Sequence, residues 1–355
     1  MQRASQWRIH PARRSLINRL VRWVVGSVAL AAGVLAAPQV ALADAAGPTD
    51  YRSEVVSVTP STDAITVTIE GGDAFVRVMV VEGHQVIVLG YDDEPYLRIS
   101  ADGTVEENRR SMATYYNAER FGSDDIPDIV DNDATPEWVK IGSGGSWAWH
   151  DHRAHWMEPE PPIGLDPGES LPAQIVPMIV NGVPVDVAVQ TTLQPSPSVW
   201  PAIFGLLIGM QIVLLGALAG PATSIFSSLV LAAAATFVGV AQFRSLPSET
   251  GPLLTWWMLP AIALICLITT ILIYGRSLMM QHALVLLAGM QLMLRAYIRR
   301  STLTKAVLPT DLPFWFDRMV TAAALTGGIT MVIVTLLAMF RPPATVDAER
   351  PTASA

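Results

Sequence analysis

The chain has 355 residues and a formal net charge of −8, and this charge is unevenly distributed. Residues 44–198 carry 26 acidic and 8 basic side chains, a formal net of −18, whereas residues 199–340 are mostly apolar. Such an acidic segment excludes nucleic-acid binding, because phosphates must be neutralised by lysine and arginine. The single cysteine, Cys266, excludes an intramolecular disulfide, so the acidic segment must be held together by its core.

The N-terminal segment has the pattern of an export signal. Its six arginines lie between residues 3 and 22, and the apolar stretch from Trp23 to Ala37 is short for a membrane span. The sequence Ala41-Leu42-Ala43 supplies small residues at a cleavage position. We predict a signal peptide over residues 1–43 in preference to an uncleaved anchor. Either one would place the chain from residue 44 onward outside the cytoplasm.

Residues 44–198 have the pattern of an all-β domain. Runs rich in β-branched residues cover 52–59 and 64–69, and further apolar runs come after them at close spacing. Asn181-Gly182 lies between two such runs, a strong signal for a tight β-hairpin. Many short strands without an intervening amphipathic helix predict an immunoglobulin-like sandwich or a related barrel.

An acidic segment over residues 119–137 interrupts the strand pattern. Six carboxylates crowd residues 124–137 of this segment, and calcium would need several oxygen ligands at one point. The glycine that permits the sharp turn of an EF-hand loop is missing. A solvated acidic loop is therefore favoured over a calcium site.

The clearest chemical signal is a histidine-rich segment at residues 147–157, Trp-Ala-Trp-His-Asp-His-Arg-Ala-His-Trp-Met. Half of the six histidines fall within residues 150–155. On a strand, His150 and His152 would share a face, and His155 could join them only if the chain turned. Imidazole suits copper and zinc, and the soft sulfur of Met157 favours Cu(I). Copper is therefore the first predicted metal and zinc the second, with Asp151 as an oxygen ligand to zinc.

The same residues are also compatible with a purely structural corner. The tryptophans of this segment would then pack over the end of the sandwich, with Arg153 stacked on a ring or paired with Asp151. His150 and His152 would serve as hydrogen-bonding residues. The predicted metal site and the structural corner remain alternatives at this stage.

The histidine-rich segment also carries a family resemblance. Together with Leu89-Gly90-Tyr91, the run from Glu94 to Arg98 and the hairpin from Pro177 to Val189, it resembles a family of exported actinobacterial membrane proteins of unknown function. The similarity covers residues ~50–200 and is most specific in the Trp-His-Asp-His-Arg-x-His-Trp-Met stretch. The resemblance implies an extracytoplasmic β domain and an association with copper handling, and it assigns no role to any residue.

The C-terminal part predicts a bundle of about five transmembrane helices. Each apolar run is close to the ~20 residues that cross a bilayer as a helix. The runs cover residues 199–219, 222–243, 253–274, 278–298 and 319–340. With the β domain outside, an odd number of spans puts residues 341–355 in the cytoplasm. The loop 299–318, with Arg299, Arg300, Lys305 and Arg318, would then lie outside, against the positive-inside rule.

These observations predict a multi-pass protein of the cell membrane with its large N-terminal domain on the extracytoplasmic side. We expect a binding protein that binds or handles a metal, copper first, through His150, His152, His155, Met157 and Asp151. The alternative is a non-catalytic interaction module that assembles with other membrane proteins. Enzymatic activity is not expected, since no GxSxG, HExxH or phosphate-binding glycine loop is present.

Overall fold

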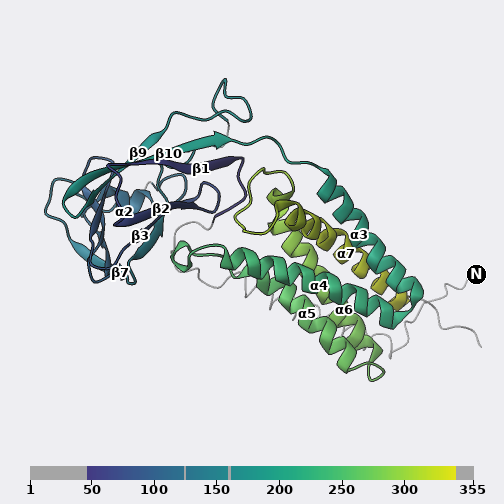
Figure 1. Ribbon diagram of the computed structural model, residues 1–355. Coiled ribbons are helices and arrows are strands. Elements are labelled where there is room, and N and C mark those ends of the chain that lie inside the picture. The colour runs from purple at the N-terminus through teal and green to yellow at the C-terminus, as the bar shows by residue number, and fades with distance from the viewer. Residues whose placement is uncertain (1–45, 124, 159–160, 341–355) are drawn as a thin grey trace, which may run out of the picture.

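The protein consists of a β-rich domain joined to a bundle of long helices (Figure 1). The structure is a computed structural model and describes residues 46–123, 125–158 and 161–340. The predicted signal peptide (residues 1–43) and the predicted cytoplasmic tail (residues 341–355) lie outside the described residues.

The strands of the β domain form two antiparallel sheets, as the sequence predicts. The larger sheet has the spatial order β1 (Tyr51–Thr59), β10 (Val183–Leu193), β9 (Gln174–Val180), β4 (Val86–Leu89), β5 (Pro95–Ile99), β6 (Val105–Asn108) and β7 (Trp138–Gly142). The smaller sheet has the order β2 (Ile65–Glu70), β3 (Phe75–Val80) and β8 (Ser146–Trp149). A short helix, α2 (Met112–Tyr116), comes after β6 and is capped by the Ser111 side chain.

The hairpin predicted at Asn181-Gly182 is confirmed. Val180 of β9 pairs with Val183 of β10, and the two turn residues have φ angles of 50° and 81°. A type I′ turn needs positive φ at both central residues, which asparagine and glycine tolerate best. This turn fixes the register of β9 against β10, the strand that pairs with β1.

One apolar core lies between the two sheets. Val76 and Val78 of β3 are fully buried against Val88 of β4 and Val187 of β10, because alternate strand residues point to the same face. Trp149, the last residue of β8, lies in the same core. The antiparallel β domain is thus confirmed, and its immunoglobulin-like topology stays a prediction.

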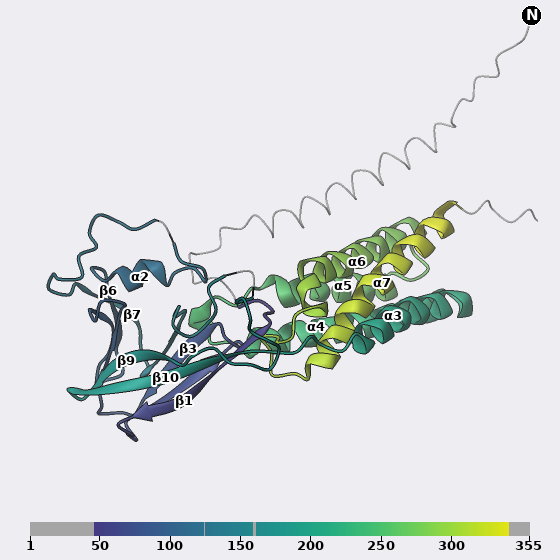
Figure 2. The ribbon, with the colours of Figure 1, turned by 90° about the horizontal axis from the view of Figure 1, so that it is seen from above.

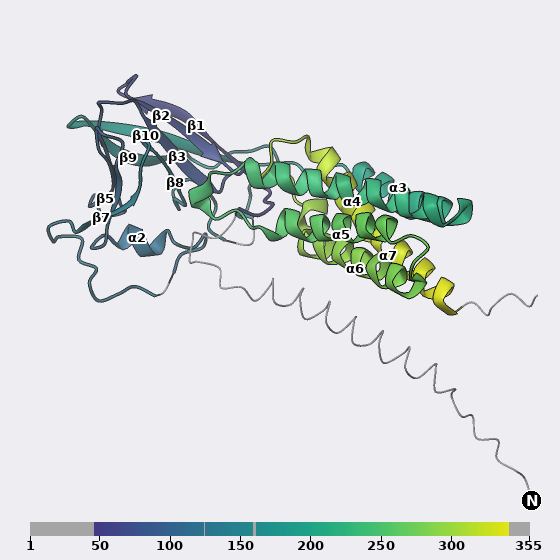
Figure 3. The same ribbon diagram turned by 90° about the horizontal axis from the view of Figure 1, so that it is seen from below.

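Within the described ranges, five helices are long and apolar enough to cross a membrane, which indicates a multi-pass membrane protein. They lie side by side (Figures 2 and 3). The five are α3 (Trp200–Ala219), α4 (Pro221–Arg244), α5 (Thr255–Leu272), α6 (Leu278–Ile298) and α7 (Phe314–Phe340). Two short 3-10 helices, η1 (Ser248–Thr250) and η2 (Arg300–Leu303), lie in the connections at the β-domain end.

Small residues bring α3 and α7 into backbone contact. A Cβ added at Gly205 would come within 2.2 Å of the Met319 carbonyl oxygen, and one at Gly209 within 2.2 Å of the Ala323 carbonyl oxygen. Close approach at small residues is how helices associate in lipid, where there is no hydrophobic drive between them. The glycines therefore hold the first helix of the bundle against the last.

The β domain contacts the connections at the near end of the bundle. Thr49 and Val307 exchange two backbone hydrogen bonds of 3.0 and 2.8 Å, and Lys305 forms an ion pair with Asp50 at 2.6 Å. Phe75 of the smaller sheet shares a small buried cluster with Trp256 of α5. The domain therefore sits on the bundle through backbone, ionic and apolar contacts.

Contacts at this end of the bundle also engage the cations of the basic loop 299–318. Arg299 forms a buried ion pair with Asp317 at 2.6 Å, and Arg318 donates to the backbone carbonyls of Lys305 and Ala306. Arg300 donates to the backbone carbonyl of Tyr297 at 3.2 Å. The protein thus engages all four cations that the predicted orientation places outside.

Candidate functional site

The histidine-rich segment forms a turn at the end of the smaller sheet. Strand β8 pairs with β3 up to Trp149, and the chain leaves the sheet at His150. The strand geometry that would put His150 and His152 on one face does not apply, because neither residue lies on a strand. Their relative positions are set by the turn instead.

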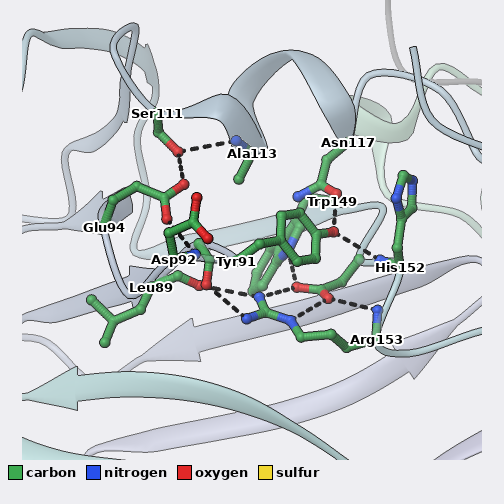
Figure 4. Close-up of polar contacts among 12 residues, drawn as sticks. Leu89, Tyr91, Asp92, Glu94, Ser111, Ala113, Asn117, Trp149, His152 and Arg153 are labelled. Carbon is green, nitrogen blue, oxygen red and sulfur yellow. Dashed lines mark hydrogen bonds and ion pairs between the residues drawn. The ribbon is translucent and has the colours of Figure 1, made fainter. Parts of the chain in front are cut away.

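A buried ion pair holds this turn in place (Figure 4). Arg153 donates from Nε and Nη2 to the two carboxylate oxygens of Asp151, each at 2.8 Å. Its Nη1 and Nη2 also donate to the backbone carbonyls of Gly90 and Leu89 at 3.0 and 3.1 Å. Arg153 therefore ties the turn after β8 to the end of β4.

Asp151 is held as a carboxylate despite its burial. Burial by itself raises the pKa of this side chain, but the hydrogen bonds and charge of Arg153 and the Trp149 indole hold the pKa below its usual range. Both carboxylate oxygens already accept hydrogen bonds. The pairing of Arg153 with Asp151 is the one that the structural-corner hypothesis proposes.

Tyr91 links the turn to helix α2. Its hydroxyl donates to Asn117 Oδ1 at 2.5 Å and accepts the backbone N–H of His152 at 3.1 Å (Figure 4). The Arg153 guanidinium lies over the Tyr91 ring at 4.8 Å. The position of His152 is thus fixed through Tyr91, which lies between β4 and β5 and is itself bonded to Asn117 at the end of α2.

Each of the three histidines uses one ring nitrogen to bond a backbone carbonyl. His150 Nδ1 lies 2.7 Å from Ala74 O, His152 Nε2 lies 3.1 Å from Glu119 O, and His155 Nδ1 lies 3.0 Å from Trp156 O. A carbonyl oxygen only accepts, so these ring nitrogens must carry the protons. The other nitrogen of each neutral ring therefore presents a lone pair.

Two of these lone pairs are buried and unpartnered. His152 Nδ1 and His155 Nε2 make no hydrogen bond with any described residue. The centroids of the two rings lie 5.5 Å apart, and that of His150 lies 6.3 Å from that of His155. Burial, assisted by the charge of Arg120, lowers the pKa of His152 and lowers that of His155 to about 3. Both rings are therefore neutral at pH 7.

Arg120 and Asp73 complete the polar corner, and no pattern in the sequence indicates either residue. Arg120 Nη2 lies 2.6 Å from Asp73 Oδ2, and Asp73 Oδ1 has no partner within the described chain. Burial raises the pKa of Asp73, and the charge and hydrogen bond of Arg120 oppose that rise. Asp73 belongs to a Gly-Gly-Asp turn and Arg120 to the start of the acidic segment, positions that suggest only loops.

A cleft of about 540 Å³ adjoins this corner at the junction with the bundle. Arg120 and Trp156 line it from the β domain, and Lys305 lines it from the connection before α7. The cleft therefore combines residues of both parts of the protein.

The predicted metal ligands are only partly brought together. Within the described ranges, no group of three or more His, Cys, Asp or Glu side chains is arranged to hold a metal ion. Asp151 is engaged by Arg153, and Met157 is half-buried two residues beyond His155. What remains of the predicted set is the pair His152 and His155. The acidic segment 119–137 likewise forms no such group in its described residues.

Comparison with models of protein families, with curated proteins and with solved structures finds no match to this chain. The family resemblance therefore stays a prediction, and the function must be argued from the geometry of the site.

Replacing Asp151 by asparagine should destabilise the protein by about 3 kcal/mol, because it leaves the buried Arg153 cation without its counter-charge. Denaturant unfolding of the detergent-solubilised protein, followed by tryptophan fluorescence, measures this loss. The control is Glu106→Gln, which breaks the more exposed Arg98–Glu106 pair and should cost about 0–1 kcal/mol. Equal losses in the two variants would contradict the role given to Asp151.

The free energy of unfolding should also decrease as the pH is lowered, because His155 is held neutral in the folded protein. Its folded-state pKa of about 3 lies below the ordinary value of 6.5, so the unfolded chain takes up the proton first as the pH falls. The stability contributed by the neutral ring is present above pH 6.5 and is lost progressively toward pH 3. Relative to His155→Gln, the wild type should lose about 2 kcal/mol of stability between pH 7.5 and pH 5. Parallel stability profiles of the two proteins would show that His155 is not held neutral.

Proposed function

We propose that this protein is a membrane-anchored binding protein whose β domain binds a Cu(I) ion through His152 Nδ1 and His155 Nε2. The observation that carries the proposal is the pair of neighbouring neutral imidazoles, each with one buried lone pair that no described residue bonds. An unpartnered buried polar atom is costly, and a small occupant such as a metal ion or a water molecule removes that cost.

The hydrogen bonds around the two rings are those expected of metal ligands. A ligating histidine usually donates its other N–H to a carbonyl or carboxylate, which fixes the tautomer and the ring orientation. Glu119 O and Trp156 O accept these bonds for His152 and His155. The two ligands are therefore already oriented without the metal.

The protonation state also favours metal binding. Metal affinity normally falls with pH because protons compete for the imidazole nitrogen. The lowered pKa values of His152 and His155 remove this competition near neutral pH. The positive charge of Arg120 opposes a cation in the corner, and the paired carboxylate of Asp73 offsets that charge.

Copper(I) fits this site better than zinc does. Zinc sites in proteins have three or four protein ligands, and the described residues offer no such group. Cu(I) accepts fewer ligands and favours soft ones, and Met157 is the nearest thioether in the sequence. Rings 5.5 Å apart are compatible with nitrogens ~4 Å apart, twice a metal–nitrogen bond of ~2 Å.

We place the β domain on the extracytoplasmic side of the membrane. This orientation rests on the predicted export signal and on the family resemblance, and the paired charges of the loop 299–318 remove the main objection to it. The close spacing of many short strands supports an immunoglobulin-like arrangement of the two sheets, and the resemblance supports a role in copper handling.

An interaction module that assembles with other membrane proteins is the second candidate function. The cleft at the junction favours it, because apolar Phe121 and Trp156 lie there beside Arg120 and Lys305. A side chain or terminus of a partner protein would find both apolar and charged contacts in this cleft. This function requires no metal, so metal binding separates the two candidates.

The full-length protein in detergent should bind one equivalent of Cu(I) in competition with a chromophoric Cu(I) chelator under reducing conditions. A His152→Gln/His155→Gln variant should lose this binding, and Zn(II) should bind the wild type at least about tenfold more weakly than Cu(I). X-ray absorption should show nitrogen ligands, with sulfur added if Met157 takes part.

The matched control is His84→Gln, because His84 lies at a distant turn of the same domain and bonds Asn181. It should bind Cu(I) like the wild type. Absence of Cu(I) binding in the wild type, or its retention in the folded double variant, would overturn the copper proposal and favour the interaction module.

The orientation can be tested by cysteine labelling. A cysteine at the fully exposed Ile163 of the β domain should react with a membrane-impermeant maleimide in intact cells. A cysteine at the exposed Arg276, in the connection at the far end of the bundle, should react only after permeabilisation. The native Cys266 is buried and can be replaced by alanine to remove background. The reverse labelling pattern would place the β domain in the cytoplasm.

A further inference from the structure

A polar stripe runs along one face of α6 and continues into η2. Gln291, Arg295 and Arg299 are spaced by four residues, and Thr302 comes three residues later, so all four lie on the same side of the helical path. All four are buried in the bundle, and Arg295 is 1% exposed. Polar residues placed this way in a membrane-spanning helix face the bundle interior and mark functional positions more often than packing.

The positive charge of this stripe exceeds the negative charge available to it. Asp317 is the one acidic residue in the five described helices. Its two oxygens already accept hydrogen bonds from Arg299 Nη2 at 2.6 Å and from the Thr321 hydroxyl at 3.1 Å. Arg295 therefore has no carboxylate of its own among the described residues.

The Arg295 guanidinium is entirely without partners among the described residues. Its Nε, Nη1 and Nη2 atoms are buried, and none makes a hydrogen bond. Arg299 Nε and the Thr302 hydroxyl are buried and unpartnered too. Arginine keeps its charge in proteins, and an unpaired buried charge is strongly destabilising, so this arrangement calls for a bound counter-anion.

We propose that the β-domain end of the bundle binds an oxyanion of the phosphate type at Arg295. The planar guanidinium offers parallel N–H donors that match two phosphate oxygens, which a single-atom anion cannot use. Arg299 Nε and the Thr302 hydroxyl are the further donors on the same face. The unpartnered acceptor of the stripe is Gln291 Oε1, and the unpartnered donors outnumber it. This excess of donors selects an anion rather than a neutral polar ligand.

The position of the site admits two sources for the phosphate group. Arg295 lies in the last turn of α6, next to the connection that contacts the β domain, and this end of the bundle is where the polar surface of a bilayer would lie. The phosphate can belong to an anionic phospholipid headgroup inserted between the helices or to free inorganic phosphate. The site is independent of the proposed copper ligands, which belong to the β domain.

The test uses the full-length protein and measures bound phosphorus and thermal unfolding. Purified wild type should carry about one phosphorus per chain, and after delipidation its unfolding temperature should rise by at least about 2–4 °C on addition of phosphatidylglycerol or potassium phosphate, relative to potassium chloride at equal ionic strength. Phosphorus that partitions into organic solvent, with a response to lipid alone, identifies the headgroup. Phosphorus in the aqueous phase, with a response to inorganic phosphate, identifies the free ion.

Two variants and a control complete the experiment. Arg295→Gln should lose the bound phosphorus and the thermal response. Arg295→Lys keeps the positive charge but lacks the parallel N–H donors of a guanidinium, so it should bind the phosphate group at least about tenfold more weakly. Arg244→Gln removes an exposed cation at the same end of the bundle and should behave as wild type. A wild type with no bound phosphorus and no response to either addition would overturn the proposal, whether or not the variants fold. An equal response in wild type and Arg295→Gln would do the same.

Discussion

The ion pair between Arg153 and Asp151 is the interaction on which the candidate site depends. The chain leaves β8 at Trp149, and nothing in the hydrogen bonds of the sheet determines its path beyond that residue. Arg153 determines the path by bonding Asp151 within the turn and the carbonyls of Leu89 and Gly90 at the end of β4. A buried carboxylate and a mostly buried guanidinium stabilise the fold only as a complete set, because either one alone would be an unpaired charge.

The turn that forms the structural corner also carries the proposed metal ligands. One nitrogen of each of His150, His152 and His155 anchors the ring to the backbone, and the opposite nitrogens of His152 and His155 remain as buried lone pairs. A structural corner and a ligand-binding site are therefore not exclusive, since the anchoring bonds are those that orient a metal ligand. The rigidity that the corner hypothesis requires is also what a preorganised binding site needs.

The junction between the β domain and the bundle shows that a count of charges along the sequence does not reveal which cations are paired in the fold. In the predicted orientation, the loop 299–318 conflicts with the positive-inside rule when its cations are counted as free charges. In the fold, Lys305 meets Asp50, Arg299 meets Asp317, and Arg318 bonds backbone carbonyls. These cations are partners for particular groups of the protein, and one of those groups, Asp50, comes from a segment more than 250 residues away.

The sequence by itself determined the features that depend on local pattern. Alternating β-branched residues, the Asn181-Gly182 turn and five apolar runs of membrane-spanning length each encode their element within a short window, so the antiparallel β domain and the five helices could be predicted. Only the tertiary structure decided which polar groups are satisfied. Asp151 is engaged by Arg153, Arg120 of the acidic segment meets Asp73 of a distant turn, and Arg295 meets no carboxylate in the part of the chain that the structure describes. The physical reason is that burial and hydrogen bonding depend on which distant segments of the chain come into contact. A local sequence pattern does not specify those contacts.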